Sequence, residues 1–251
     1  MPLNLRKRIA AFAIRKPAMS DGKILRDARQ FWAILRKDLL LEVRSKDVFT
    51  STFLFSVMAL VIFHFAFSPN LKNLTPVAAG MLWVAVLFSS LLGLNRSFVH
   101  EKDEECLDGL LLCPVDRPVI FVAKFAGNLI YITILQIIVV PIFVLFFLDG
   151  ITGPVVLKLA LILFLGDLGI CGVGTLLATI SANTRARDLL LPILYLPVMT
   201  PFMMQVVSYT NAAIVGGSKA VDAASWLYLI IAFDIMFLLV SYALYDFVIG
   251  E

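Results

Sequence analysis

Five polar side chains lie inside long apolar runs and are the first candidates for chemistry: His64, Asn128, Gln136, Asp167 and Asp234. Ionisable groups at membrane depth are costly, so each is a candidate for function. Asp167 and Asp234 could form a proton or ion path across a bilayer. Each carboxyl could instead be neutral or hydrogen-bonded to a neighbouring helix. We favour this second interpretation because no Lys or Arg lies at a similar depth.

Few residues could ligate a metal or a haem. His64 and His100 are the two histidines of the chain, and they lie on opposite sides of the membrane in the topology derived below. A bis-histidine haem site within one chain is therefore not expected. Cys106, Cys113 and Cys171 form neither a C-x-x-C pair nor a Cys/His zinc spacing. We predict no metal site, no cofactor bound by this chain and no nucleic-acid partner.

The glycines between Gly166 and Gly174 superficially resemble a phosphate-binding loop. No strand precedes them, no Gly-Lys-Ser/Thr closes them, and the chain has no Walker A sequence. Gly174, Ala178 and Ala182 instead follow the small-xxx-small spacing that lets helices approach closely. We expect a packing face here, and we predict that the chain is not an enzyme by itself.

The elements that carry these residues follow from composition. Hydrophobic residues make up 61% of the chain and charged residues 16%, against roughly half and a quarter in soluble domains. The apolar residues come in helix-length runs without regular alternation, which disfavours a β-barrel. We predict an all-α integral membrane protein with a six-helix transmembrane domain at 48–249. Its spans are expected at 48–68, 76–97, 119–148, 155–181, 188–209 and 226–249.

Prolines complicate two of these spans. The third span is longer than the hydrocarbon requires, and we expect it to begin along the interface or to bend at Pro141. In the fifth span, Pro192, Pro197 and Pro201 must kink or break the helix. An odd number of spans would change the orientation derived below.

Two segments precede the first span. Residues 1–23 form a basic tail without the features of a signal peptide; we interpret them as cytoplasmic rather than as an organelle-targeting peptide, and translation could begin at Met1 or Met19. Residues 24–47 repeat apolar residues at helical spacing with cations on other faces. The apolar set is Leu25, Ala28, Phe31, Trp32, Leu35 and Leu39, and the cations are Arg26, Arg29, Arg36, Lys37 and Arg44. We predict an N-terminal interfacial amphipathic helix whose Trp and Phe enter the lipid bilayer.

The distribution of Lys and Arg predicts the orientation. With the N-terminus inside, the inner segments hold the tail, the interfacial helix, Arg96, Lys102, Arg117, Lys124, Arg185 and Arg187, and the outer segments hold Lys72, Lys158 and Lys219. The positive-inside rule then places both termini in the cytoplasm. Lys124 and Lys158 lie near span ends, from which their ammonium groups can snorkel to the headgroups.

A polar, acidic island at Val99–Pro118 separates the second and third spans. Carboxylates precede Leu107, Leu110 and Leu111, which share a helical face, and Pro114 ends the helix. We predict a cytoplasmic amphipathic helix at 101–114 that docks on a separate soluble protein; a solvated loop is the alternative. Its candidate coupling residues are Glu101, Glu104, Glu105, Leu107, Asp108, Leu110, Leu111, Pro114 and Arg117.

From about Trp32 to the C-terminus, an ordered set of short motifs carries a family resemblance. They are RKDLLLEVRSKD, IFHFAFSP, GMLWVAVLFSSLLGLNRSF, GLLLCPVDRP, KFAGN, NTRARDLLLPILYLPVMTP and AFDIMF. In order and spacing the chain resembles the CcmB family, the membrane permease subunit of the ABC-type complex in cytochrome c maturation, known as the haem exporter. The basic extension is longer than expected for that family, and Asp167 stands where an uncharged residue is expected.

The resemblance implies a six-transmembrane-helix ABC exporter permease in the bacterial inner membrane. It implies that Glu101–Pro114 is the coupling helix seated in the ATPase subunit CcmA, which binds the ATP, in a complex with the membrane protein CcmC. It further implies haem as the substrate, delivered across the membrane by release of the haem-loaded chaperone CcmE. The missing axial ligand pair argues against a haem channel within this chain.

Other functions stay open at this point. One is a general ABC exporter permease for a lipid, polysaccharide or drug, which would have a wide polar cavity in a homodimer. Another is a non-transporting membrane scaffold, for which the partner's ATP hydrolysis would be dispensable. A third is proton-coupled transport through Asp167 and Asp234, which would depend on a pH gradient.

Overall fold

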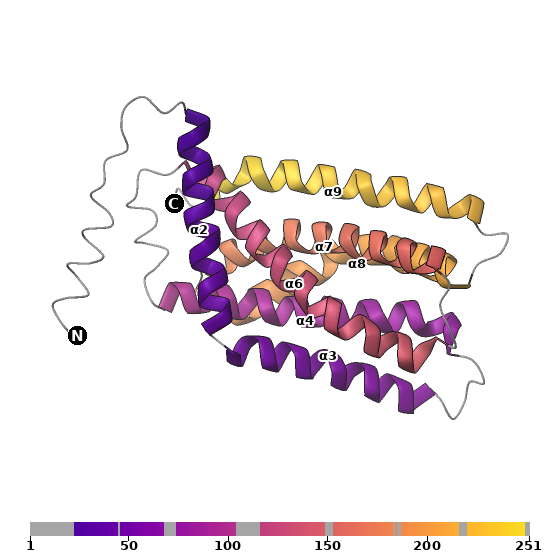
Figure 1. Cartoon of the computed structure of the whole chain (residues 1–251). Coiled ribbons are helices and arrows are strands. Elements are labelled where there is room, and N and C mark those ends of the chain that lie inside the picture. Colours follow the sequence, from indigo (N-terminus) through magenta and orange to yellow (C-terminus); the bar gives the residue numbers. More distant parts are fainter. Residues whose placement is uncertain are drawn as a thin grey trace.

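The computed structural model describes residues 23–44, 46–67, 74–103, 116–148, 153–182, 184, 187–215 and 220–248. Within these ranges the chain forms α-helices and no strand (Figure 1). The helices are α2 (Lys23–Arg44), α3 (Lys46–Phe67), α4 (Thr75–Asp103), α6 (Arg117–Phe147), α7 (Gly153–Ala182), α8 (Arg187–Val215) and α9 (Ala220–Val248). All but α2 contain a stretch long and apolar enough to cross a membrane, by length and composition. The predicted all-α membrane architecture with six spans is confirmed.

The six apolar helices run side by side, with α7 in the middle of the bundle (Figure 1). Helix α7 packs against α4, α6, α8 and α9, and its apolar residues join a core that includes Trp83, Phe143, Tyr195 and Phe202. Large apolar side chains on the outer helices face away from the protein, as on α3 and α9. This distribution is that of a bundle whose outer surface meets lipid.

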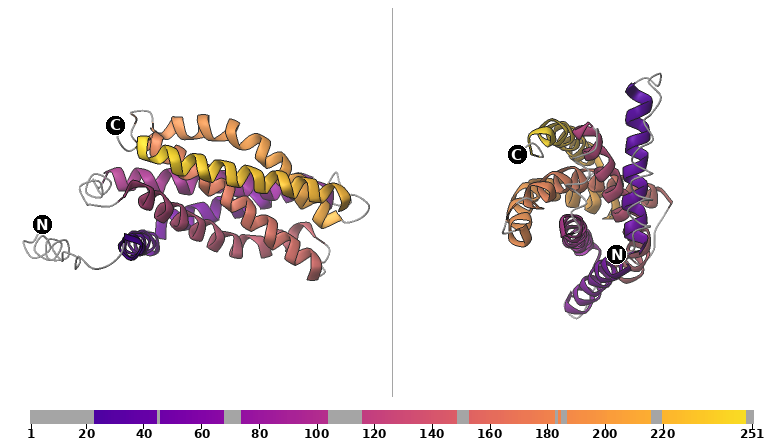
Figure 2. Two further views of the ribbon diagram at one scale, coloured as in Figure 1. Left: turned by 90° about the horizontal axis from the view of Figure 1, so that it is seen from above. Right: turned by 90° about the vertical axis from the view of Figure 1, so that its left-hand side faces the viewer.

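Helix α2 lies across one end of the bundle, transverse to the spans (Figures 1 and 2). An interfacial helix has this orientation, since it lies in the plane of the headgroups. The prediction that the Trp and Phe of this helix both face lipid is partly wrong, however. Ile34 and Leu35 are buried against the bundle and Phe31 packs beside them, whereas Trp32 points away and is 64% exposed. Much of the apolar face of α2 thus binds protein.

The prolines bend helices without breaking them. Helix α8 continues from Arg187 to Val215 through Pro192, Pro197 and Pro201, and Figure 2 shows it bowed. Helix α6 likewise contains Pro141. Of the two outcomes open for the fifth span, the bend is the one observed. Neighbouring helices hold the helical backbone where a proline removes a donor.

Helix α4 runs past Ser97, where the second span was expected to end, and continues to Asp103. The first residues of the predicted coupling helix, 101–103, are therefore a continuation of α4 rather than a separate helix start. The remainder of that helix lies outside the described residues. Helix α6 then begins at Arg117, after Asp116 in an extended conformation, with Pro118 in its first turn.

Two glycines let α7 approach its neighbours. A Cβ at Gly166 would overlap the ring of Trp83 on α4, and one at Gly169 would overlap Phe202 on α8 and lie 2.7 Å from Asp234 Oδ1 on α9. The Trp83 indole N–H also donates a hydrogen bond to Thr210 Oγ1 on α8, with an N–O distance of 2.9 Å. The glycines of α7 therefore serve contacts on several sides of the helix, a wider role than one packing face.

Candidate functional site: buried polar contacts between helices

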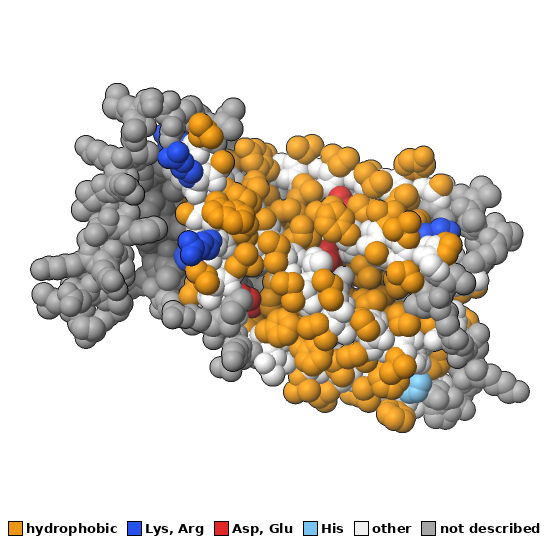
Figure 3. Space-filling view, viewed as in Figure 1, with side chains coloured by type: hydrophobic (Ala, Val, Ile, Leu, Met, Phe, Trp, Pro, Cys, Tyr) orange, Lys and Arg blue, Asp and Glu red, His pale blue; other side chains and the backbone are white. Residues whose placement is uncertain are grey.

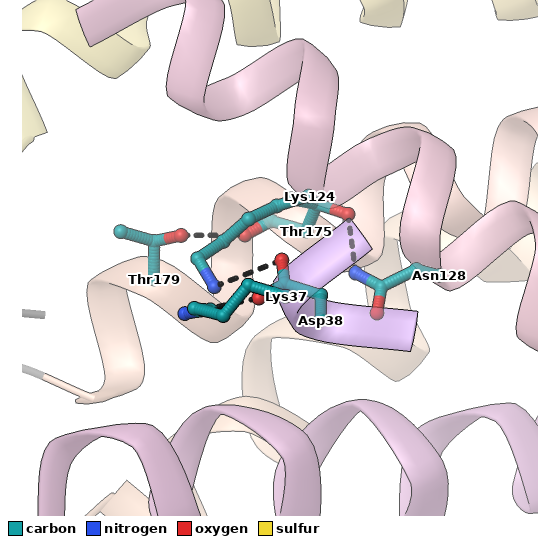
Figure 4. A network of polar contacts seen from close by, with 6 residues as sticks. All are labelled: Lys37, Asp38, Lys124, Asn128, Thr175 and Thr179. Atoms are coloured by element: carbon teal, nitrogen blue, oxygen red, sulfur yellow. Dashed lines mark hydrogen bonds and ion pairs between the residues drawn. The ribbon is translucent and has the colours of Figure 1, made fainter. Parts of the chain in front are cut away.

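The first polar cluster lies where α2 crosses the bundle (Figure 4). Lys124 Nζ on α6 is 3.7 Å from Asp38 Oδ2 on α2, and Lys37 Nζ is 3.0 Å from Asp38 Oδ1. The Lys124 side chain is only 6% exposed and that of Asp38 is 16% exposed. A buried ammonium requires a partner, and α2 supplies the carboxylate.

This cluster corrects the expectation that Lys124 snorkels to the headgroups. Its side chain is held inside the protein because α2 packs directly over α6. The two helices touch at Gly127, where a Cβ would lie at ordinary contact distances, 3.7 Å from Leu35 Cδ1 and 3.8 Å from Asp38 Cβ. Lys124 and Gly127 are three residues apart, so they lie on the same side of α6.

The side of α6 that carries Lys124 also contacts α7. Asn128 Nδ2 donates a hydrogen bond to Thr175 Oγ1 on α7 at 3.0 Å, and Thr179 Oγ1 donates to the Thr175 carbonyl at 2.8 Å (Figure 4). Asn128 was selected from sequence as a polar group inside a span. Its observed contact is with the neighbouring helix, so it joins α6 to α7.

The second polar cluster surrounds Asp167, near the middle of the apolar stretch Gly153–Ser181 of α7. Gln136 Nε2 on α6 donates to Asp167 Oδ1 at 2.6 Å, and Thr133 Oγ1 donates to Oδ2 at 3.4 Å. Asp167 is buried with both donors on one neighbouring helix. This geometry is that of the hydrogen-bonded packing interpretation, in which the carboxyl fixes α7 against α6.

Asp234 differs from Asp167 in its surroundings. It is 4% exposed, and within the described part of the chain neither carboxyl oxygen has a hydrogen-bond partner. Its side chain abuts Gly169. It lies at the middle of the apolar stretch Ala224–Tyr245 of α9. The two buried carboxyls thus lie at similar depth on adjacent helices, but of the two only Asp167 accepts hydrogen bonds from described side chains of a neighbouring helix.

Replacing Asp234 with asparagine is expected to change the free energy of unfolding by less than about 1 kcal/mol and to leave complex assembly intact. Asparagine has nearly the same shape, and no described donor is lost. Gln136→Leu is the comparison, because it removes the 2.6 Å donor to Asp167 and should cost about 1–3 kcal/mol. Thermal unfolding of the purified protein measures both. A large loss in Asp234→Asn would show that the charge itself is structural.

His64 lies near the C-terminal end of α3 among aromatic rings. Its ring centroid is 5.1 Å from that of Phe146, 5.6 Å from Phe65 and 5.7 Å from Phe147. His100 belongs to the last turn of α4, at the other end of the bundle (Figure 1). The two histidines are therefore far apart, as the topology predicted. Among the residues with described placement, no group of three His, Cys, Asp or Glu side chains gathers as metal ligands would.

The predicted coupling residues are only partly covered by the structure. Glu101 belongs to the last turn of α4 and Arg117 begins α6. Glu104, Glu105, Leu107, Asp108, Leu110, Leu111 and Pro114 lie outside the described residues. The end of α4 and the beginning of α6, which flank these residues in the sequence, lie at the same end of the bundle as α2 (Figure 1).

Sequence reasoning missed the Asp38–Lys124 pair. The available signal was the spacing of Lys124 and Asn128, which are four residues apart and so share one side of α6. Thr175 and Thr179 repeat the same spacing on α7.

The surface agrees with a membrane protein: apolar side chains form a broad band over the spans, with Lys and Arg near its ends (Figure 3).

Six apolar spans, a helix across their end and polar contacts between helices define a multi-pass α-helical membrane protein. The Asp38–Lys124, Asn128–Thr175 and Gln136–Asp167 contacts each join neighbouring helices. Comparison with known proteins then gives the family. The chain belongs to the CcmB family, because the family model described as CcmB protein matches residues 29–248.

Individual relatives agree with this assignment. The chain is 27% identical to Heme exporter protein B of Rhodobacter capsulatus over 172 residues, which are 68% of this chain and 78% of that relative. It is 25% identical to Heme exporter protein B of Haemophilus influenzae over 183 residues, 73% of this chain and 82% of that relative. With the protein of that name from Escherichia coli strain K12 it shares 31% identity over 98 residues, 39% of this chain and 44% of that relative.

Proposed function

We propose that this chain is the membrane permease subunit of an ABC-type complex that acts in haem delivery for cytochrome c maturation. The observation that carries the proposal is the CcmB family match over residues 29–248, supported by relatives named Heme exporter protein B. Haem is the substrate handled by the complex. ATP is bound and hydrolysed by a separate subunit, since this chain has no Walker A sequence.

In this proposal the ATPase subunit CcmA docks on Glu101–Pro114, and CcmC is the partner in the membrane. ATP hydrolysis drives release of the haem-loaded chaperone CcmE. The complex lies in the bacterial inner membrane with both termini of this chain in the cytoplasm, as the distribution of Lys and Arg favours. The position of α2 at the end of the bundle that also bears the α4–α6 connection supports this orientation (Figure 1).

Affinity purification of the chain from its native membranes tests the function directly. The proposal expects an ATPase subunit, a second membrane protein and a haem absorbance band in the purified complex. Recovery of the chain without any ATPase would exclude the transporter role.

Changing Leu110 and Leu111 together to aspartate is expected to reduce the co-purified ATPase at least roughly tenfold, because charges would enter an apolar socket. The matched control is Lys102→Gln with Asp103→Asn, which alters two charges of the same segment at positions outside the candidate coupling residues and should have little effect. Quantitative immunoblotting of membranes measures the bound ATPase. Equal binding by the leucine variant and the control would place the docking surface elsewhere.

A further inference from the structure

The Asp38–Lys124 pair joins α2 to α6 close to the beginning of α6. Lys124 is seven residues after Arg117, the first residue of α6, and so lies about 10 Å along that helix. The segment proposed above to dock the ATPase joins α6 directly at that end. Any displacement of the segment therefore enters α6 close to Lys124.

Two different kinds of contact fasten this part of α6 to its neighbours. The ion pair joins α6 to α2, and the Asn128–Thr175 hydrogen bond joins α6 to α7 (Figure 4). The same three helices and α9 also share a separate apolar cluster of buried residues: Ile34, Ile120, Phe121, Ala123, Leu176 and Tyr245. This cluster is distinct from the main core of the bundle.

The ion pair adds something that apolar contacts do not supply. An apolar side chain that changes neighbours can find new apolar contacts, whereas a buried ammonium that leaves its carboxylate loses a compensating charge that apolar neighbours do not replace. With Lys124 6% exposed, sliding of α2 along α6 would carry that cost. Lys37 binds the other carboxylate oxygen from within α2 and holds Asp38 in place.

We propose that Asp38 and Lys124 are positioning residues that make α2 and the beginning of α6, with α7, move as one rigid body when the ATPase-docking segment moves. The inference rests on the proposed function, because it assigns a route to the motion that the ATPase supplies. Helix α2 then carries the motion along the membrane surface, and α7 carries it to the middle of the bundle. The ion pair sets the register between the two helices.

A disulfide can replace the ion pair, because a Cβ at Gly127 lies 3.8 Å from Asp38 Cβ, within the range of natural disulfides. The variant is Asp38→Cys with Gly127→Cys and Lys124→Met, in a background with Cys106→Ser, Cys113→Ser and Cys171→Ala. Replacing Asp38 and Lys124 together avoids leaving the buried Lys124 ammonium without the Asp38 carboxylate. Gly127→Cys alone in the same background is the matched control, since its added Cβ meets only ordinary contacts.

The measurement is ATP hydrolysis by the complex of this chain and its ATPase in proteoliposomes, after oxidation and after reduction with dithiothreitol. The oxidised form is expected to retain at least half of the wild-type rate, and the reduced form to lose at least fivefold. Loss of activity in the oxidised form would show that α2 must slide on α6 and would overturn the proposal. Full activity in both forms would also overturn it, because the link would be unnecessary.

The amount of ATPase bound to the complex separates this inference from the proposed function. If the ATPase does not bind the wild-type chain at all, the proposed function fails. If it binds every variant equally while hydrolysis follows the redox state, the rigid body is supported. A charge exchange, Asp38→Lys with Lys124→Asp, gives an independent check in cells: accumulation of c-type cytochromes should fall at least fivefold in each single variant and recover in the double variant. Equal accumulation in singles and double would contradict the positioning role.

Discussion

Replacing Asp38 with asparagine is expected to lower the free energy of unfolding by about 3–5 kcal/mol, the usual cost of removing one member of a buried ion pair. Lys124 is 6% exposed, so the ammonium would keep its desolvation cost and lose the carboxylate 3.7 Å away. The midpoint of thermal unfolding in detergent, followed by tryptophan fluorescence, should fall by roughly 6–20 °C. The loss should occur without any change in the apolar contacts of α2.

The chain offers a matched control on the same helix. Arg26 Nε is also 3.7 Å from a carboxylate, Asp27 Oδ1, but these side chains are 46% and 26% exposed. Asp27→Asn should therefore cost less than about 1 kcal/mol. Asp38→Asn combined with Lys124→Met should recover most of the stability, because the buried ammonium is then gone and the remaining cation, Lys37, is 35% exposed and can be solvated by water. Similar losses of stability in Asp27→Asn and Asp38→Asn would show that burial of the Asp38–Lys124 pair does not determine its contribution to the free energy of unfolding.

The overall architecture could be predicted from sequence because lipid imposes simple rules. A helix that satisfies its own backbone and carries about 20 apolar residues is nearly the only way such runs can exist in a bilayer. The runs therefore specified the number of spans. Proline patterns were less decisive, since Pro192, Pro197 and Pro201 permit both a bend and a break, and the packing of α8 against α4, α7 and α9 favours the bend.

The contacts of α2 show that helical periodicity does not specify which apolar side chains face lipid and which face protein. Phe31 and Trp32 are adjacent and both apolar, so an amphipathic pattern includes them in one face. In the structure Phe31 packs on the bundle and Trp32 points away. Lipid and protein interior both accept apolar side chains, and the pattern alone cannot distinguish them. The pattern therefore predicted the helix but not its contacts.

The polar contacts were the hardest part to predict. Asp38 and Lys124 are distant in sequence, and each resembles an ordinary interfacial charge when considered alone. Asp167 was expected to be hydrogen-bonded, but its donors Gln136 and Thr133 became evident only when α6 was placed beside α7. Partners between helices depend on helix rotation, which hydrophobic runs do not specify.

Gly166→Val is expected to destabilise the protein by about 3 kcal/mol, at the upper end of the cost of overpacking a core. Even a single Cβ at this position would overlap the ring of Trp83, which is itself 1% exposed. The ring cannot move away freely, because its N–H donates to Thr210 Oγ1 on α8. Either α7 must separate from α4 or this hydrogen bond must break. Thermal unfolding and the emission maximum of the tryptophans report both outcomes.

Gly80→Val on α4 is the control for a valine introduced into a membrane helix, because no atom lies within 4 Å of a Cβ at Gly80. Its effect should be below about 1 kcal/mol, since only helix propensity changes. A double variant isolates the overlap: Trp83→Leu should make Gly166→Ala less costly than it is alone, because the smaller side chain leaves room for the methyl group. Thr210 would still donate to the Val206 carbonyl at 2.7 Å, so losing the indole does not leave that hydroxyl without a partner. Strictly additive costs in this cycle would mean that the close approach of α7 to α4 at Gly166 does not depend on the absence of a side chain.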